Sequence, residues 1–241
     1  MIPKTIHYVW VGHNPKSKII QECIATWKKN LPDFKFVEWN EDNFDMHENK
    51  YIEQAYQAKK WAFVSDYIRA QAIYEQGGIY LDTDVRVVSD LTPLLNDRAF
   101  IGFENNNYLS AAIFGAEKGH PFMQDILDYY KDRNFEYDVN NQMAGVNSVS
   151  VTDMLIDKYG LKIGNKEQIA QRGQSTFYPD GVLCNPSADS KSIHLFTGTW
   201  MNGKHSFKHK IVTDLKRHIN TPKGAGLYAK WIRWDKRNYK N

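Results

Sequence analysis

Apolar and polar positions over the first 40 residues change from strand-like to helix-like spacing and back. Residues 5–11, TIHYVWV, are β-branched and aromatic and stand between a proline and a glycine, which predicts a buried strand. Residues 17–30 repeat apolar side chains at the spacing of one helical face. Residues 34–39, FKFVEW, predict a second strand. A strand, helix, strand opening favours parallel strands in a sheet of nucleotide-binding type.

The middle of the chain predicts two helices and a return to the sheet. The helices cover residues 49–60 and 62–76, and the second ends at Gly77 and Gly78, where glycine can take the left-handed conformation that closes a helix. The strand IYL follows. Further strands are predicted at 99–103, 110–115 and 191–196, and further helices near 121–132, 148–159, 206–218 and 225–234. Residues 161–190 are rich in Gly, Pro and Asn and predict an irregular lid or acceptor loop.

The overall composition is that of a soluble α/β protein with one main domain. Of the 241 residues, 42% are hydrophobic and 24% are charged, and no run approaches the roughly 20 apolar residues of a membrane span. The first residues do not have the pattern of a signal peptide. Cys23 and Cys184 are the two cysteines, too few for a disulfide framework or a CxxC metal site. We therefore expect a cytoplasmic protein.

The net charge of +3 is unevenly distributed. Residues 204–241 hold 11 Lys and Arg against 2 Asp and Glu, whereas residues 1–203 hold 20 against 26. Near its end the basic tail also contains Tyr228, Trp231, Trp234 and Tyr239. Cations interleaved with aromatic rings suit an anionic membrane surface, although a solvated helix that packs its tryptophans on the domain fits the same pattern. A nucleic-acid partner is not predicted, because no recognisable binding fold accompanies the basic terminus.

Two carboxylates lie one residue apart in GGIYLDTDVRVV, residues 77–88. Like charges this close repel, so Asp82 and Asp84 are expected to share a cation, and in an extended chain they would point the same way. Mg²⁺ and Mn²⁺ accept oxygen ligands and leave positions open for phosphate oxygens, so such an ion could neutralise a diphosphate leaving group. Taken alone, the pattern also fits a polar strand end followed by a turn.

The helix before this motif carries a second charged pair. Asp66 and Arg69 stand three residues apart, which makes them neighbours on the helix surface. A simple intrahelical salt bridge explains the spacing. The rest of the helix is apolar, however, so the pair is expected either to face a polar cleft or to be paired internally.

Three separated segments, in chain order, resemble the DXD sugar-binding glycosyltransferases of family 32. That family includes bacterial capsule and lipopolysaccharide enzymes and fungal Golgi mannosyltransferases, and the glucosyltransferase domains of large clostridial toxins are more distantly similar. The segments are the opening IPKTIHYVWVG, the series Ala62, Ser65, Asp66, Arg69, Gly77, Gly78, Ile79, Tyr80, Asp82 and Asp84, and HLFTGTW at residues 194–200. The resemblance covers roughly residues 1–200 and leaves the tail unexplained.

The resemblance implies a GT-A fold, a Rossmann-like mixed sheet flanked by helices, for a nucleotide-sugar-binding catalytic domain over residues 1–203. Residues 204–241 would form a helical extension. The implied reaction is a retaining, metal-dependent transfer of a hexose from a nucleotide sugar to a glycan or lipid-linked acceptor in surface polysaccharide synthesis. A UDP-sugar is favoured over GDP-mannose, because the HYVWVG strand is closer to the UDP-using relatives. The enzyme would act at the inner face of the cell membrane.

The resemblance also implies a role for individual residues. Trp10 would stack on the base, and Val9 would hold it through the backbone. The residues expected to contact the sugar, ribose and phosphates of the donor are Ser65, Asp66, Arg69 and Tyr80. At the closing segment, Thr199 and Trp200 match the family, although threonine replaces the usual serine. Trp10 equally fits a core residue beside a strand.

The implied metal site is built from Asp84, Asp82 and His194, with Mn²⁺ or Mg²⁺ as the ion. Asp84 would bind the metal directly, whereas Asp82 would contact donor hydroxyls or bind the metal through water. His194 would be the late ligand, although a lone histidine in SIHLF is also typical of a core residue. The catalytic set would be Asp66, Arg69, Asp82 and Asp84. No residue identifies itself as a nucleophile.

On the acceptor side, the segment FENNNYLSAAIFGAEKGHPF resembles the family, which implies that Glu104, Asn105 and Asn106 line the cleft. Three consecutive asparagines equally predict a turn.

Two other classes of function fit part of the same pattern. In an aspartate-nucleophile phosphatase, Asp82 would attack phosphorus and Asp84 would act as acid and base with Mg²⁺ nearby. Such enzymes usually carry the motif on their first strand, whereas several predicted elements precede it here. The other class is a non-catalytic sugar-nucleotide-binding protein. Mn²⁺-dependent hydrolysis of a nucleotide sugar separates these classes.

Overall fold

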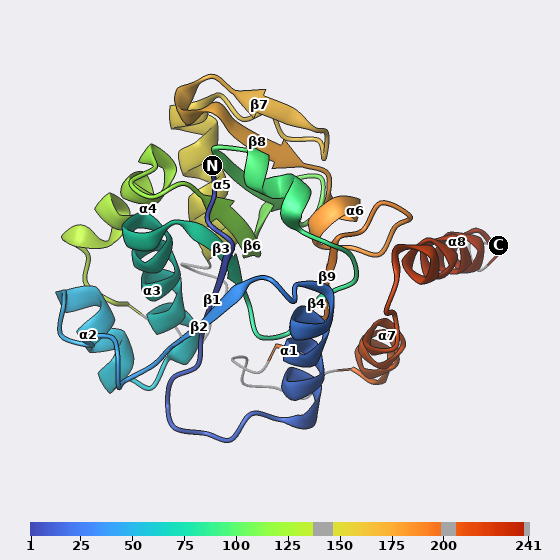
Figure 1. The fold of residues 1–241 in the computed structure, drawn as a ribbon, viewed down its shortest axis with the longest axis horizontal. Coiled ribbons are helices and arrows are strands. Elements are labelled where there is room, and N and C mark those ends of the chain that lie inside the picture. Colours follow the sequence, from blue (N-terminus) through green and yellow to red (C-terminus); the bar gives the residue numbers. More distant parts are fainter. Residues whose placement is uncertain (137–146, 199–205, 239–241) are drawn as a thin grey trace.

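A seven-stranded sheet forms the centre of the described molecule (Figure 1). The computed structural model describes residues 1–136, 147–198 and 206–238. In spatial order the strands are β2 (Lys35–Trp39), β1 (Thr5–Val9), β3 (Gly78–Leu81), β6 (Leu109–Ala116), β5 (Ala99–Phe103), β8 (Ser175–Tyr178) and β7 (Gln168–Ala170). The strand β1 pairs in parallel with both β2 and β3, whereas β6 is antiparallel to β3 and β5. The expected α/β class with a mixed sheet is confirmed.

Helices cover both faces of this sheet. They are α1 (Lys18–Asn30), α2 (Lys50–Gln57), α3 (Trp61–Gln76), α4 (Pro121–Lys131), α5 (Asn147–Tyr159), α6 (Asp180–Leu183), α7 (Phe207–Arg217) and α8 (Pro222–Asn238), with 3₁₀ turns at Thr92–Asn96 and Arg172–Gln174. On one face the sheet packs against α2, α3, α4 and α5, and on the other against α1. The sheet therefore has a hydrophobic core on each face. Side chains alternate along a strand, so Tyr80 of β3 lies in the core beneath α2, α3, α4 and α5, whereas Ile79 and Leu81 lie in the core beneath α1.

The stretch 161–190 differs from the prediction of an irregular loop. It contains β7, β8 and α6, and β8 pairs in parallel with β5 from Ala99 opposite Ser175 to Gly102 opposite Tyr178. The run STFY of β8 is short and half polar, so it has no strong pattern of its own. Its strand conformation comes from pairing with a buried neighbour, which a local reading of the sequence does not detect.

A second sheet, of two strands, lies beside the first. It joins β4 (Val85–Val87) to β9 (Ser192–His194) in antiparallel register, with Val85 opposite His194. The predicted strand at 191–196 is therefore confirmed in part. The antiparallel pairing brings two segments more than 100 residues apart in the sequence into direct contact.

The two glycines at the end of α3 have positive φ and neighbours that leave no room for a side chain, and for Gly78 these neighbours belong to β1. Gly77 has φ +66° and caps the helix by donating to the carbonyl of Ile73, as predicted. A side chain on Gly78 would lie 2.7 Å from the carbonyl oxygen of Thr5. Glycine at this position lets β3 lie close to β1, so Asp82 emerges at the same sheet edge as Trp10.

The C-terminal extension packs against the body of the molecule. Ile219 and Ala225 are buried in a small core shared with Cys23 of α1 and Ile193 of β9. Arg217 also pairs with Glu22 of α1. The predicted boundary between residues 203 and 204 falls outside the described residues. Among the described helices, none is both long and apolar enough to cross a membrane.

His7 fastens the loop at the end of α3 to the sheet. Its Nε2 lies 2.9 Å from the carbonyl oxygen of Gly77, and its Nδ1 accepts a hydrogen bond from Trp39 Nε1 at 3.0 Å. This arrangement requires the neutral ring with the proton on Nε2. Burial lowers the pKa of His7 to about 4, from an ordinary value of 6.5.

We predict that His7 makes the fold weaken in mild acid. The unfolded chain binds a proton on this histidine below pH 6.5, whereas the folded chain does so only near pH 4, so stability is lost as the pH falls through this window. Urea unfolding measures the free energy of unfolding at pH 7 and at pH 4.5. The decrease between these two pH values should be about 2 kcal/mol smaller in His7→Asn than in the wild type. His47→Asn, at an exposed histidine, is the control and should keep the wild-type loss. Equal losses in His7→Asn and the wild type would contradict the assignment.

Candidate active site

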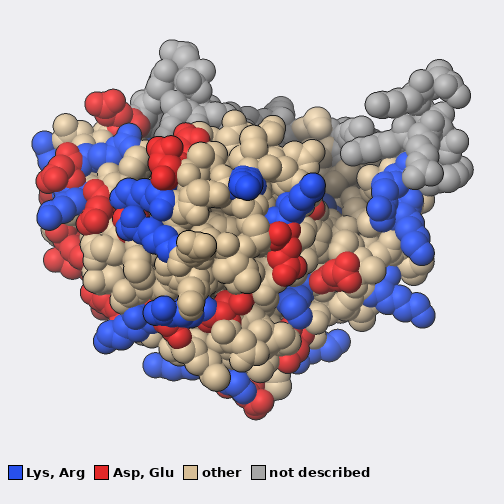
Figure 2. Space-filling model, turned by 90° about the horizontal axis from the view of Figure 1, so that it is seen from above, with Lys and Arg blue, Asp and Glu red and all other residues tan. Residues whose placement is uncertain are grey.

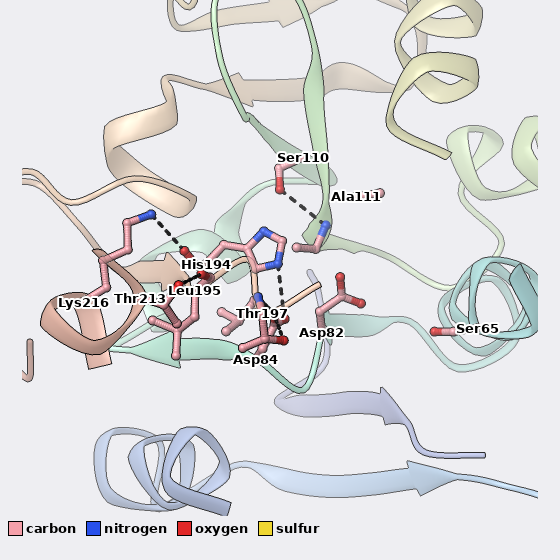
Figure 3. Close-up of polar contacts among 12 residues, drawn as sticks. Ser65, Asp82, Asp84, Ser110, Ala111, His194, Leu195, Thr197, Thr213 and Lys216 are labelled. Atoms are coloured by element: carbon pink, nitrogen blue, oxygen red, sulfur yellow. Dashed lines mark hydrogen bonds and ion pairs between the residues drawn. The ribbon is translucent and has the colours of Figure 1, made fainter. Parts of the chain in front are cut away.

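The DXD motif lies on a turn between two strands. β3 ends at Leu81 and β4 begins at Val85, whose N–H donates to the carbonyl of Asp82 at 3.0 Å. The two carboxylates therefore do not share one face of a continuous strand, which is how an extended chain would have aligned them. They nevertheless converge with His194, and one ligand atom from each of the three residues lies within 4.8 Å of the others (Figure 3).

Asp84 is held by both of its carboxylate oxygens. Oδ1 lies 3.2 Å from Nε2 of His194, and Oδ2 accepts hydrogen bonds from the N–H and the hydroxyl of Thr197, both at 2.8 Å. Burial alone would raise the pKa of Asp84, but the charge of His194 and these hydrogen bonds hold it well below its ordinary value. Burial alone would lower the pKa of His194, but Asp84 raises it well above its ordinary value.

Asp82 is more exposed and is attached to the sheet and to α3. Its Oδ1 accepts a hydrogen bond from the hydroxyl of Tyr80 at 2.7 Å, and the same hydroxyl lies 3.0 Å from Oγ of Ser65. The side chain of Asp82 is 26% exposed, compared with 12% for Asp84. The carboxylate of Asp82 is therefore open to a ligand, whereas that of Asp84 is held by contacts inside the protein.

Arg69 connects α3 to the DXD turn and to β6. Its Nη1 donates to the carbonyl of Ala111 at 2.7 Å, and its Nη2 lies 3.0 Å from Asp66 and 3.4 Å from Asp82. Burial alone would lower the pKa of this guanidinium, but the negative charges of Asp82 and Asp66 raise it above its ordinary value. Of the two arrangements expected for the Asp66–Arg69 pair, the structure has the internal one.

The donor set of Asp82, Asp84 and His194 fits a divalent ion. Two carboxylates and an imidazole match the ligand preferences of Mn²⁺, whereas Mg²⁺ prefers oxygen ligands throughout. The backbone N–H of Leu195 donates to the carbonyl of Asp84 at 3.1 Å, so the two strands that carry the donors are joined next to them. The other ring nitrogen of His194, Nδ1, is buried, and the contact of Nε2 with Asp84 contributes to the orientation of the ring.

The comparison with known families decides the identity of this region. Residues 17–101, which include the Asp66–Arg69 pair and the DXD turn, match the family model described as a glycosyltransferase sugar-binding region containing a DXD motif. Over these residues the chain is similar to the sugar-binding region of DXD glycosyltransferases. The resemblance inferred from the sequence is thereby confirmed.

Two curated relatives are mannosyltransferases or synthases of yeasts. An inositol phosphoceramide mannosyltransferase of Schizosaccharomyces pombe is 28% identical over 137 residues, which cover 52% of this chain. A mannosyl phosphorylinositol ceramide synthase of Saccharomyces cerevisiae is 25% identical over 138 residues, or 54% of this chain. In both cases the match covers 36% of the length of the yeast protein.

Similar solved structures include two glycosyltransferases. The PaToxG glycosyltransferase is 20% identical with a TM-score of 0.48, over 65% of this chain and 69% of that one. The glycosyltransferase GlyE of Streptococcus pneumoniae is 10% identical with a TM-score of 0.49, over 96% of this chain and 64% of that one.

Val9 and Trp10, the residues expected to hold the nucleotide base, lie at the end of β1. Val9 is buried in β1 opposite Trp39, and Trp10 follows directly. The indole N–H of Trp10 donates to the carbonyl of Asn14 at 2.6 Å, and Nζ of Lys16 lies 5.3 Å from the ring centroid. The ring is only partly buried, so a base could stack on it. Thr199 and Trp200, expected to close the donor site, lie outside the described residues.

The acceptor-side residues divide into a turn and one carboxylate. Asn105 accepts hydrogen bonds from the N–H groups of Asn107 and Tyr108 in the β5–β6 hairpin, and Asn106 is exposed beside it, which is the turn that the asparagines equally predicted. Glu104 instead lies near the metal donors. Burial raises its pKa, while the positive charges of His194 and Lys216 oppose that rise.

Two residues at the site were not predicted from the sequence. Thr197 lies within the HLFTGTW segment, so its position was marked, but its bonds to Asp84 depend on the chain direction after β9. Lys216 lies on α7 and donates to the carbonyl of His194 at 3.2 Å. No local pattern distinguishes this lysine from the other cations of the tail.

We predict that the Arg69 network is a major source of stability in the sugar-binding region. Arg69→Met should lower the free energy of unfolding by about 3 kcal/mol, because it leaves the buried carboxylate of Asp66 without this partner. Urea unfolding followed by fluorescence measures this change. Arg98→Met is the matched control, since Arg98 pairs with Glu117 at the surface and should cost under about 1 kcal/mol. An Arg69→Met protein as stable as the control would contradict this role.

Proposed function

We propose that the protein is a retaining, metal-dependent glycosyltransferase that moves a hexose from a nucleotide sugar to a glycan or lipid-linked acceptor. The convergence of Asp82 and Asp84, which lie in the matched sugar-binding region, with His194 from outside it supports this proposal most directly. A divalent ion held there would neutralise charge on the diphosphate as it leaves. Mn²⁺ is the proposed ion, because the donor set includes an imidazole.

The residues around these donors have separable proposed roles. Asp84 and His194 form the fixed part of the ion site, because hydrogen bonds and burial hold both side chains in place. Asp82 is open enough to contact the donor as well as the ion or its water shell. Asp82 is held in position by a hydrogen bond from Tyr80 and by the charge of Arg69. Ser65 in turn contacts the hydroxyl of Tyr80, and Asp66 pairs with Arg69. Trp10 is proposed to stack on the base, and Val9 to hold the base through its backbone.

The donor is proposed to be a UDP-sugar, as the opening strand suggests, with GDP-mannose as the second candidate. The second candidate is supported by the two yeast relatives, whose names state mannosyl transfer. Glu104 is proposed to contact the acceptor, because its carboxylate lies on the hairpin side of the site and burial raises its pKa, which suits a group that binds sugar hydroxyls. Surface polysaccharide synthesis is the proposed setting.

The first test measures release of the nucleoside diphosphate. Purified protein with Mn²⁺ is incubated with a panel of UDP-sugars and GDP-mannose, with and without glycan acceptors. We expect one donor to be turned over, and Asp84→Asn to lower kcat/KM at least about 100-fold, because the ion loses its best-held ligand. Asp90→Asn is the control, since Asp90 is exposed and only caps the turn at Thr92. Hydrolysis of phosphate esters without nucleotide-sugar turnover would refute the proposal, and tight binding of a nucleotide sugar without turnover would indicate a binding protein.

We also propose that the C-terminal extension binds the surface of an anionic membrane. Among the side chains of α7 and α8 that the structure describes, four large apolar ones are exposed: Ile211, Leu215, Leu227 and Trp231. Exposed cations accompany them, and Figure 2 shows Lys and Arg gathered at the edge of the molecule where α7 and α8 lie in Figure 1. Apolar side chains beside cations suit the interface of an acidic bilayer.

Point variants test the membrane proposal without removing the extension. Leu227→Ser with Trp231→Ser should weaken binding to phosphatidylserine vesicles roughly tenfold in a sedimentation assay, because apolar area no longer enters the interface. Ile169→Ser, at an exposed isoleucine of β7 outside the extension, is the matched control and should bind as the wild type does. Unchanged vesicle binding by the double variant would remove the membrane proposal.

A further inference from the structure

Lys216 is a buried cation that reaches the site from the C-terminal extension. It is 8% exposed, and its Nζ donates to the carbonyl oxygen of His194 at 3.2 Å (Figure 3). Three residues earlier on α7, the hydroxyl of Thr213 donates to the carbonyl of Leu195 at 3.4 Å. One helix therefore holds two consecutive carbonyl groups of the segment that leaves β9.

The aromatic ring of Phe196 links the same lysine to the histidine ring. Its centroid lies 3.9 Å from that of His194 and 4.9 Å from Nζ of Lys216. Phe196 has φ +54°, a left-handed conformation that a phenylalanine adopts only when its surroundings enforce it. This strained residue contacts both His194 and Lys216.

The segment held in this way makes most of the contacts to Asp84. His194 contacts one carboxylate oxygen, Thr197 donates twice to the other, and the N–H of Leu195 donates to the backbone carbonyl of Asp84. A shift of residues 194–197 would change every one of these contacts. The geometry of the ion site therefore depends on the contacts that hold residues 194–197 in place, which include those from α7.

Attraction between Lys216 and a bound ion does not explain its position. A lysine charge near a divalent cation is repulsive, and the repulsion is strongest where water is excluded. Burial lowers the pKa of Lys216, while the negative charges of Asp84 and Glu104 oppose this change. The benefit that offsets the repulsion is the hydrogen bond to the carbonyl of His194 and the contact with Phe196.

We propose that Lys216 is a positioning residue that holds His194 and Thr197 in the arrangement that binds the divalent ion, so that α7 is part of the active site. The inference rests on the proposed function. It gives the C-terminal extension a role in ion binding. The membrane proposal gives it no such role, and the matched sugar-binding region does not include it.

The test measures Mn²⁺ binding to the whole protein by calorimetry, without donor or acceptor. Lys216→Met keeps the length of the side chain and removes the donor, and we expect it to weaken Mn²⁺ binding by about tenfold or more, as loss of an outer-shell partner does. Lys216→Arg keeps a donor and should stay within about threefold of the wild type. Lys210→Met is the matched control, at an exposed lysine of the same helix, and should not change the affinity.

The sign of the change separates positioning from charge. If Lys216 acted only through its charge, Lys216→Met would bind Mn²⁺ more tightly, and tighter or unchanged binding overturns the inference. Thr213→Val, which removes the neighbouring bond, is the second variant and should weaken binding in the same direction if Lys216→Met does not fold. Circular dichroism establishes which variants are folded. A wild type that binds no Mn²⁺ would refute the metal-dependent function itself, whereas failure of the inference alone leaves wild-type binding intact.

Discussion

The pairing of β4 with β9 is the contact on which the site depends, because it joins Asp84 to His194 across more than 100 residues of chain. Each strand is only three residues long and would not be stable alone. Their pairing is supported by Trp27 of α1, whose indole N–H donates to the carbonyl of Val85 at 2.7 Å, and by the small core around Ile193. The ion donors therefore stand on a short sheet that the rest of the fold holds in place.

Charge compensation is the second constraint. Two aspartates, Asp66 and Asp82, meet Arg69 where the apolar helix α3 approaches the DXD turn, and the arginine satisfies a backbone carbonyl of β6 as well as both carboxylates. Buried charges are tolerated only when they are paired and hydrogen-bonded. Arg69 thus does for Asp82 what Thr197 and His194 do for Asp84, and the two carboxylates of one motif are oriented by different parts of the chain.

The C-terminal extension contributes to the site by one face and exposes another. Lys216, Ile219 and Ala225 are directed into the body, while Leu227 and Trp231 remain at the surface. The tail packs on the domain through Ile219 and Ala225 and not through Trp231, which is exposed, so the prediction that the tryptophans pack there is wrong for Trp231. Because helical side chains project on all sides, one helix can both hold the segment after β9 and present apolar groups to a surface.

Local sequence pattern determined a large part of this protein: the α/β class, most helices and strands of the first 130 residues except β4, and the DXD motif with Asp66 and Arg69 before it. These features follow from hydrophobic spacing, glycine at positive φ and side-chain chemistry, all of which are encoded within a few residues. Only the tertiary structure decided that residues 175–178 extend the sheet, that Asn105 serves a turn, and that Thr197 and Lys216 support the ion donors. Those outcomes depend on which distant segments pack together, and the free energy that selects them comes from burial and pairing across the whole chain.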